Sequence, residues 1–272
     1  MTNSNHSQSN DLDTKLAIVT GGSSGIGAEL AVSLAKAGWD VAITYAGNEQ
    51  GAIEVTQAIN ETGQRSFYQR CDVGYSEQVN DFVAQVVQHF SIAPTLLVNN
   101  AGCQTWAPFL ELKEEDWDKV IRTNLKGCFL FSQAVARVMV EHKSGGAIVN
   151  IGSGCNKAPF PNLVDYTASK GGMEMLTRSA AIELGKYGIR VNCVAPGGIE
   201  IARTREEAPD YAQTWGKVAP LGRVGFPDDI FNAVEFLATP ASSFVTGQTI
   251  WVDGGVFTAP NWPYEQSYVV EN

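Results

Sequence analysis

Short apolar runs alternate with amphipathic segments along most of the chain. The run KLAIVT, which begins at Lys15, is rich in β-branched residues and predicts a strand that stops at a glycine turn. The next segment, AELAVSLAKAG, has apolar residues at helical spacing and ends on Gly38, which predicts a helix with a glycine C-cap. The sequence therefore opens with a strand, a turn and a helix.

The same alternation continues to the end of the chain. Strands are predicted at DVAITY, RSFYQRCDV, TLLVNNAG, GGAIVNIGS, GIRVNCVAPGG and QTIWVDGG, and helices at about 50–61, 76–90, 114–143, around DYTASK, and from about 228. Nearly continuous apolar strands between helices are typical of a parallel sheet that is covered on both faces. We therefore expect a single-domain α/β Rossmann fold over residues 14–272, with a doubly wound parallel sheet of about seven strands.

The N-terminal segment, the apolar stretches and the cysteines bear on the cellular compartment. Residues 1–13, MTNSNHSQSNDLD, lack the basic start and apolar core of a signal peptide, so we expect a flexible N-terminal tail. No apolar stretch approaches the roughly 20 residues that span a bilayer. The five cysteines, an odd number without CxxC spacing, suit reduced thiols in a cytoplasmic protein.

The charge balance makes several partners improbable. A formal net charge of −10 disfavours nucleic acid and anionic membranes, because both require a basic surface. The three histidines stand apart from carboxylates and thiols, so we expect no protein-bound metal.

A glycine-rich turn, TGGSSGIG at residues 20–27, follows the first predicted strand. Glycines at such a turn let the backbone approach a ligand, and the following helix directs free N–H groups and its positive end at a phosphate. The alternative is that these glycines only allow a helix to pack closely on a strand. The position of the turn in a βαβ series favours phosphate binding.

The segment DYTASK places Tyr166 four residues before Lys170 on a predicted helix, so the two side chains share a face. A lone pair with this spacing is more often a surface pair, but Ser153, at the end of a predicted strand, precedes Tyr166 by thirteen residues, a spacing that resembles the one in a known enzyme family. A nearby ammonium stabilises a phenolate, which lowers the pKa of a tyrosine from about 10. We therefore expect Tyr166 to be a general acid in carbonyl reduction and a general base in alcohol oxidation, with Ser153 bonded to the substrate oxygen.

These features, in this order, resemble the classical short-chain dehydrogenase/reductase family from about Lys15 to Gly255. The motifs that carry the resemblance are TGGSSGIG, CDV at 71–73, NNAG at 99–102, NLKG, NIGS, YTASK, PGG at 196–198 and WVDGG. The resemblance implies that Lys170 also holds the nicotinamide ribose. It further implies that Asn124 holds a water connected to Lys170, although Asn124 could instead be a helix-interior side chain satisfied by backbone. A homotetramer is also implied.

The resemblance places a dinucleotide along the ends of the strands. Asp72 and Val73 would flank the adenine, the NNAG segment would lie against the adenosine, and the residues after Pro196 would hold the nicotinamide. The expected cofactor-binding set is Gly21, Ser23, Ser24, Gly25, Ile26, Gly27, Tyr45, Asp72, Val73, Asn99, Ala101, Gly102, Tyr166, Lys170, Pro196, Gly197 and Ile199. The chain departs from the family pattern P-G-x-I-x-T by having Ile201 in place of the threonine, for which Thr204 is a possible substitute.

The second strand suggests which dinucleotide is used. An NAD-preferring fold usually ends this strand on a carboxylate that binds the ribose 2′-hydroxyl, whereas this strand ends on Tyr45. Asp40 precedes the strand, Glu49 begins the next helix, and no Arg or Lys stands in the turn or directly after the strand. We therefore favour NADP(H), with NAD(H) also possible.

The resemblance also implies a substrate lid over residues 201–224. Tyr211 and Trp215 in this lid, with Trp106 and Cys155, are the candidate substrate contacts, although the two lid aromatics could equally pack the lid onto the body.

We expect an NADP(H)-dependent oxidoreductase that acts on a small ketone, secondary alcohol or sugar, like carbonyl reductases and glucose dehydrogenases. The alternatives are a 3-oxoacyl-[acyl-carrier-protein] reductase and, with less support, a non-catalytic dinucleotide-sensing protein.

Overall fold

Seven parallel strands form one sheet in the order β3-β2-β1-β4-β5-β6-β7. The structure is a computed structural model and describes residues 15–258. The flexible tail predicted over residues 1–13 lies outside the described residues. The strands are β1 Lys15–Val19, β2 Trp39–Tyr45, β3 Ser66–Arg70, β4 Leu96–Asn99, β5 Gly146–Ile151, β6 Ile189–Pro196 and β7 Thr249–Val252.

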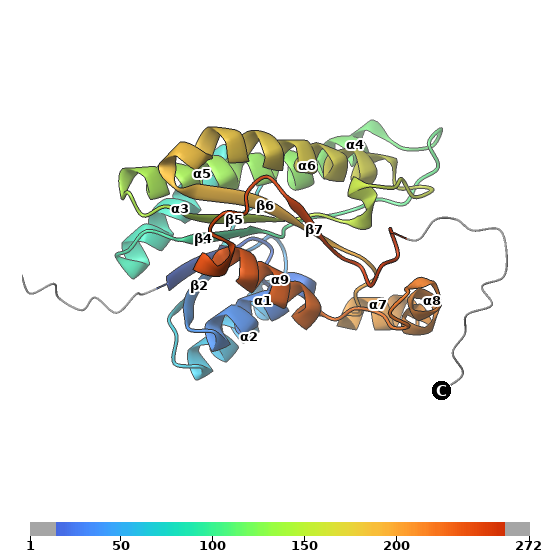
Figure 1. Cartoon of the computed structure of the whole chain (residues 1–272), viewed down its shortest axis with the longest axis horizontal. Helices are drawn as coiled ribbons and strands as arrows, with labels where there is room; N and C mark the ends of the chain where they lie inside the picture. The colour runs from blue at the N-terminus through green and yellow to red at the C-terminus, as the bar shows by residue number, and fades with distance from the viewer. Residues whose placement is uncertain (1–14, 259–272) are drawn as a thin grey trace, which may run out of the picture.

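Helices cover both faces of this sheet (Figure 1). On one face lie α1 Gly25–Lys36, α2 Glu49–Glu61 and α9 Pro227–Ala238. On the other face lie α3 Ser76–Phe90, α5 Gly127–Glu141 and α6 Val164–Leu184. The predicted doubly wound α/β sheet is confirmed.

Strand β1 illustrates why its sequence is apolar without interruption. Ala17 and Val19 pack with α1 and α2 on one face, whereas Leu16 and Ile18 pack with α3 and α5 on the other. Successive side chains of a strand point to opposite faces, so a strand covered on both sides buries every position.

Several predicted boundaries were wrong, and two of them bear on the site. The helix expected over 114–143 is divided into α4 Glu114–Val120, a π-helix η1 Ile121–Lys126, and α5. The strand expected to reach Val73 ends at Arg70, and the Cys71 nitrogen still donates a 2.8 Å bond to the Tyr45 carbonyl oxygen of β2. Since π-helical turns often mark functional positions, the break at η1 directs attention to Asn124 within it.

The strand order reverses between β1 and β4, which are neighbours in the sheet. The connections that follow these two strands therefore diverge and leave a crevice at the carboxyl ends, where open α/β sheets bind ligands. Beyond β6, the expected lid contains two helices, α7 Ala202–Glu207 and α8 Tyr211–Val218, which extend from one end of the body (Figure 1). Within residues 15–258, no helix is both long and apolar enough to cross a membrane.

Candidate active site

The glycine turn leaves no room for side chains at two of its positions. A Cβ on Gly27 would lie 2.3 Å from Asn100 Nδ2 and 2.4 Å from the carbonyl oxygen of Gly21. Gly21 itself has a positive φ of 63°, and a Cβ on it would lie 2.9 Å from Ala101 Cα. Glycine at these positions therefore allows the turn to pack directly on the loop after β4.

Hydrogen bonds lock this turn to the loop after β4. Thr20 Oγ1 accepts bonds from the backbone nitrogens of Asn100 and Ala101, both at 3.0 Å, and Asn100 Nδ2 donates to the Thr20 carbonyl oxygen at 3.0 Å. Asn99, a predicted cofactor contact, instead directs its buried amide into the core, where it donates to Ser132 and Asn150. The side chain of Asn99 is therefore committed to the core, and only its backbone remains for a cofactor.

The start of α1 suits an anion. Ser24 is the N-cap residue, its side chain makes no capping bond, and the first turn of the helix contains no acidic residue. The positive end of the helix dipole and unoccupied N–H groups favour phosphate binding there. Together with the missing side chains at Gly21 and Gly27, the residues present fit a dinucleotide.

Tyr166 and Lys170 are brought together on α6, as predicted. Lys170 is 3% exposed, and its Nζ donates a 2.7 Å hydrogen bond to the carbonyl oxygen of Ile151, the last residue of β5. The same Nζ lies 5.5 Å from the centroid of the Tyr166 ring. The lysine is therefore fixed between the end of the sheet and the tyrosine.

Asn124 lies in the π-helix η1 and is completely buried. Its Oδ1 accepts from the backbone nitrogen of Cys103 at 2.8 Å, and its Nδ2 donates to the Cys103 carbonyl oxygen at 2.9 Å and to Ser169 Oγ at 3.0 Å. The side chain thus joins the loop after β4 to α6. This arrangement matches the interpretation in which backbone groups satisfy the asparagine amide, and the water-holding role stays a prediction.

Ser153 follows β5 and caps the short 3-10 helix η2 Gly154–Asn156. Its Oγ accepts from the backbone nitrogen of Cys155 at 3.2 Å, so the hydroxyl proton is available for another acceptor. Cys155, which we expected at the rim of the cleft, is instead buried. A residue that the sequence did not suggest, Phe257, packs its ring against Gly154, where a Cβ would come within 2.7 Å of three ring atoms.

The lid brings one aromatic residue towards Tyr166. Burial raises the pKa of Tyr211 on α8, and Tyr166 is among the neighbours that raise it further. Trp215, one helical turn later, packs its ring on Gly198, where a Cβ would lie 2.4 Å from ring atom Cδ2. Trp106 lies in the loop after β4 and is 67% exposed. Tyr211 is therefore near enough to the proposed acid for the two side chains to interact electrostatically.

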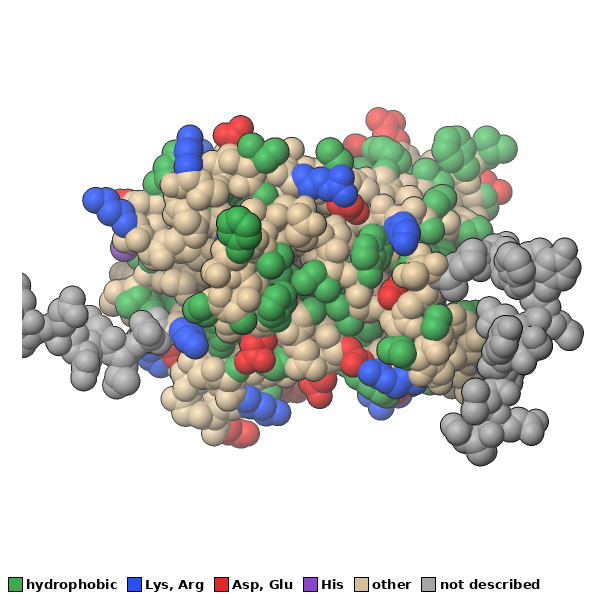
Figure 2. Space-filling view, viewed as in Figure 1, with side chains coloured by type: hydrophobic (Ala, Val, Ile, Leu, Met, Phe, Trp, Pro, Cys, Tyr) green, Lys and Arg blue, Asp and Glu red, His purple; other side chains and the backbone are tan. Residues whose placement is uncertain are grey.

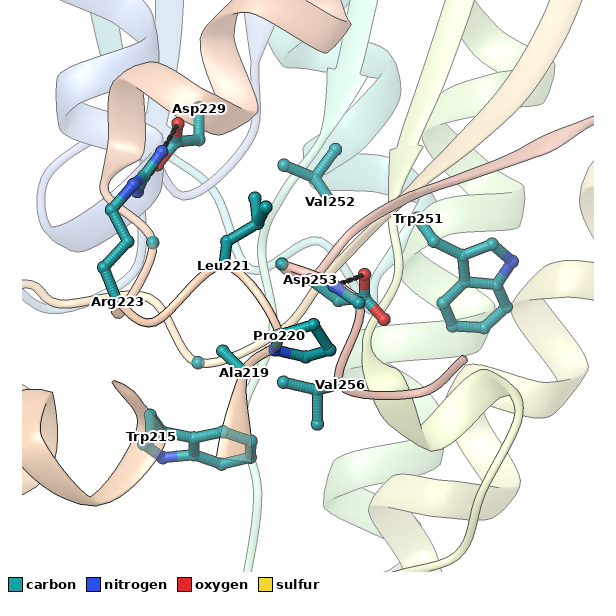
Figure 3. A pocket seen from close by; sticks show the side chains of 14 residues that line it. Trp215, Ala219, Pro220, Leu221, Arg223, Asp229, Trp251, Val252, Asp253 and Val256 are labelled. Atoms are coloured by element: carbon teal, nitrogen blue, oxygen red, sulfur yellow. Dashed lines mark hydrogen bonds and ion pairs between the residues drawn. The ribbon is translucent and has the colours of Figure 1, made fainter. Parts of the chain in front are cut away.

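A cavity of about 430 Å³ lies beside the lid (Figure 3). In the figure, Trp215 lies below Pro220 and Val256, and the Arg223–Asp229 ion pair stands at one edge. Its lining is mostly apolar and, within the described chain, includes neither Tyr166 nor Ser153. The cavity therefore adjoins the segment after Pro196 through Gly198 and Trp215, but it does not include the proposed acid.

The hydroxyl of Thr204, the possible substitute for the family threonine, is bonded to the backbone of Ile201. Its Oγ1 accepts from the backbone nitrogen of Ile201 and donates to the Ile201 carbonyl oxygen, both at 2.9 Å. The hydroxyl therefore caps α7, while the Ile201 side chain reaches Gly25, at which a Cβ would lie 3.2 Å from Ile201 Cδ1.

The end of β2 carries charges that the sequence did not place there. Tyr45 Oη donates a 2.9 Å hydrogen bond to Glu49 Oε1, so a carboxylate does stand beside the end of this strand. Arg70, at the end of the neighbouring strand β3, lies opposite Tyr45 in the sheet register. Asp40, expected before the strand, lies within β2 at its opposite end, where it pairs with Arg65. Neither the glycine turn nor the residues directly after β2 contain Arg or Lys, as the sequence indicated, but Arg70 brings a basic group to this place from β3.

Comparison with known proteins identifies the family. A protein-family model described as enoyl-(acyl carrier protein) reductase matches residues 21–257. The 3-oxoacyl-[acyl-carrier-protein] reductase of Staphylococcus epidermidis is 40% identical over 243 residues, which are 89% of this chain and 99% of that protein. The chain belongs to the classical short-chain dehydrogenase/reductase family.

Solved structures of this family have the same fold. The acetoin dehydrogenase of Enterobacter cloacae has a TM-score of 0.85 and 35% identity, over 94% of this chain and 100% of that chain. A gluconate 5-dehydrogenase of Burkholderia cenocepacia, in complex with NADP and tartrate, has a TM-score of 0.84 and 36% identity, over 92% and 97%. As a short-chain dehydrogenase/reductase, the protein is a nicotinamide-dependent oxidoreductase.

Proposed function

We propose that the protein is an NADP(H)-dependent oxidoreductase that interconverts a small ketone or sugar carbonyl with its secondary alcohol. The observation that carries this proposal is the position of Lys170 Nζ, 2.7 Å from the Ile151 carbonyl oxygen and 5.5 Å from the centre of the Tyr166 ring. Burial of an ammonium beside a phenol favours negative charge on the phenol oxygen, which a general acid must carry after it gives up its proton.

Each residue of the site has a distinct task in this proposal. Tyr166 donates its hydroxyl proton to the carbonyl oxygen during reduction and removes it from the alcohol during oxidation. Ser153 donates a hydrogen bond to the same oxygen and stabilises the charge that develops on it. Asn124 fixes the loop after β4 to α6 through Cys103 and Ser169, and it holds the water proposed from the family resemblance. The bound nicotinamide supplies or accepts the hydride.

The cofactor would lie along the carboxyl ends of the strands. Its phosphates would meet the turn that includes Gly21, Ser24 and Gly27, and Asp72 would lie at the adenine. NADP(H) is favoured because β2 ends on Tyr45 without a carboxylate in the chain position typical of NAD enzymes. The NADP complex of the Burkholderia gluconate 5-dehydrogenase supports this choice, and use of NAD(H) as well is compatible with it.

A second candidate function is reduction of a 3-oxoacyl group carried by acyl carrier protein. The 40% identity to the Staphylococcus reductase favours it. Against it stands the formal net charge of −10, because an acidic carrier protein requires a basic docking surface. A role in dinucleotide sensing without chemistry has less support, since Asn124, Ser153, Tyr166 and Lys170 are all present.

We further propose a single catalytic domain that assembles as a homotetramer in the cytoplasm. Large apolar side chains are exposed on two separate parts of the body: Phe129, Met175 and Ile182 on α5 and α6, and Phe236 and Phe244 on and after α9. Figure 2 shows apolar side chains gathered in the middle of one face, where Figure 1 has α9 and β7. Exposed apolar patches of this kind favour subunit contacts. The five free cysteines suit a reducing compartment.

The test is turnover of NADPH and NADH with acetoin, aldoses, 5-ketogluconate and 3-oxoacyl thioesters, the last with and without acyl carrier protein. A higher kcat/KM with a small ketone or sugar than with a 3-oxoacyl thioester supports the first proposal. A large increase in kcat/KM when the 3-oxoacyl group is carried by acyl carrier protein would favour the second. Cofactor binding without any turnover would contradict both and leave the sensing role.

A further inference from the structure

Arg70 reaches across the sheet to the end of β2. It is the last residue of β3 and is paired with Tyr45, the last residue of β2. Its Nε donates a 3.2 Å hydrogen bond to the carbonyl oxygen of Ala46, the first residue beyond β2. The guanidinium therefore lies beside the connection between β2 and α2, although Arg70 is 25 residues from Tyr45 in the sequence.

The terminal nitrogens of Arg70 are available to a ligand. The residue is exposed, and among residues 15–258 these two nitrogens form no hydrogen bond or ion pair. A guanidinium with free terminal donors can bind a phosphate through two parallel hydrogen bonds. The guanidinium of Arg70, although it comes from β3, lies at the end of β2, the second strand. A dinucleotide fold recognises the 2′ group of the adenosine ribose at the end of this strand.

A hollow in the surface adjoins Arg70 and Asp72. A polar cavity of about 610 Å³ lies at the ends of β2 and β3 and the start of α3. Its lining residues are Ala46, Gln69, Arg70, Asp72, Gln78 and Asp81. The lining includes Asp72, the residue proposed to contact the adenine, so Arg70 and the proposed adenine contact face one hollow.

Glu49 and Arg70 carry opposite charges and both lie near Tyr45. Its Oε1 accepts the Tyr45 hydroxyl hydrogen at 2.9 Å. Burial and Glu49 raise the pKa of Tyr45, whereas Arg70 lowers it, so both charges act on one hydroxyl group. A 2′-phosphate at this point would be attracted by Arg70 and repelled by Glu49, while a 2′-hydroxyl could donate to the carboxylate.

We propose that Arg70 binds the 2′-phosphate of NADP(H) from the neighbouring strand and that Glu49 opposes it, so that this pair sets the cofactor preference. The inference rests on the proposed use of NADP(H). It explains how the chain accommodates a 2′-phosphate although neither the glycine turn nor the connection after β2 contains Arg or Lys.

The first test compares kcat/KM for NADPH and NADH. Arg70→Ala is expected to lower the NADPH value by about 10- to 100-fold, because a charged hydrogen bond to the phosphate is lost, and to change the NADH value less than about twofold. Glu49→Gln is expected to raise the NADPH value by about threefold, because it removes a repulsive charge. Arg178→Ala, which removes an exposed arginine on α6, is the control and should leave both values unchanged.

The second test needs no turnover. Calorimetry with adenosine 2′,5′-bisphosphate and with AMP reports the 2′-phosphate contact directly. The inference predicts that Arg70→Ala weakens the binding of adenosine 2′,5′-bisphosphate by about 10- to 100-fold and leaves the binding of AMP unchanged. Equal weakening of both ligands, or of neither, would overturn it. If the wild type reduces no carbonyl but shows this selective loss, the proposed reaction fails and the role of Arg70 stands.

Discussion

The hydroxyl of Thr105 donates a hydrogen bond to the buried carboxylate of Asp165, the residue that precedes Tyr166 on α6. The other oxygen of Asp165 accepts the backbone N–H of Tyr166 at 2.7 Å. The carboxylate also lies in the first turn of α6, where the helix dipole favours negative charge. Asp165 thus ties the loop after β4 to the helix that carries the proposed acid.

Replacement of Thr105 by Val should destabilise this connection. The substitution leaves one oxygen of a buried carboxylate without its donor, which costs about 1–3 kcal/mol. We expect a lower free energy of unfolding by chemical denaturation, together with a reduced kcat. Thr105→Ser keeps the hydroxyl and is the matched control. Equal stability of the Val variant and the wild type would show that the contact is not needed.

Replacement of Tyr166 by Phe should remove the proton donor while leaving the ring on α6. General acid catalysis contributes about 10²- to 10⁴-fold to a rate, so we expect kcat to fall by that factor. The dissociation constant of NADPH, measured by fluorescence titration, should change little. Full activity of the Phe variant would exclude Tyr166 as the acid.

Two glycine-to-alanine substitutions should have opposite effects. Gly27→Ala would force a methyl group within 2.4 Å of Asn100 Nδ2 and the Gly21 carbonyl oxygen, which should lower stability by about 1–3 kcal/mol and weaken dinucleotide binding. Gly171→Ala, inside α6, meets no atom within 4 Å and should raise stability by up to about 1 kcal/mol. Thermal unfolding with and without NADPH measures both effects.

The ion pair at the start of α9 should give a defined pH dependence. The Arg223 guanidinium, bonded to both oxygens of Asp229 at 2.8 Å, holds the pKa of that carboxyl below its ordinary value. A carboxyl with a lowered pKa stabilises the fold above its ordinary pKa of about 4, and this contribution disappears as the pH falls through the lower folded value.

Asp229→Asn should therefore be less stable than the wild type by about 1 kcal/mol near neutral pH, since both side chains are partly exposed. This difference should shrink as the pH falls from 5 to 3. Asp228→Asn removes an exposed carboxylate from the same helical turn and is the control. A difference that stays constant over this pH range would exclude the ion pair as its source.

The cysteines should differ in reactivity towards iodoacetamide at neutral pH. Burial raises the pKa of Cys71 and Cys128 to about 12 and that of Cys193 to about 11, so their thiolates are scarce as well as shielded. Cys103 is partly exposed. We expect Cys103 to be alkylated first, with the site determined by mass spectrometry. Early modification of Cys71 or Cys128 would contradict the burial of these residues.

The sequence by itself determined the features that depend on short spacing. Strand β1 could be predicted because a strand covered on both faces has to be apolar at every position. The glycine turn could be predicted because it directly follows that strand. The Tyr166 and Lys170 pair could be predicted because side chains four residues apart on a helix lie on one face.

Only the tertiary structure decided which distant residues meet. Arg70 stands beside Ala46 because β3 pairs with β2 in one register, and a shift of one residue would turn its side chain to the other face of the sheet. The π-helical break around Asn124 accompanies side-chain bonds to Cys103 and Ser169, which come from two other segments. The periodicity of apolar residues predicts the length of a helix, but it does not predict side-chain hydrogen bonds to other segments. The sequence therefore determined the candidate reacting pair and the succession of strands and helices along the chain, whereas the pairing of strands in the sheet decided which charges surround the proposed cofactor site.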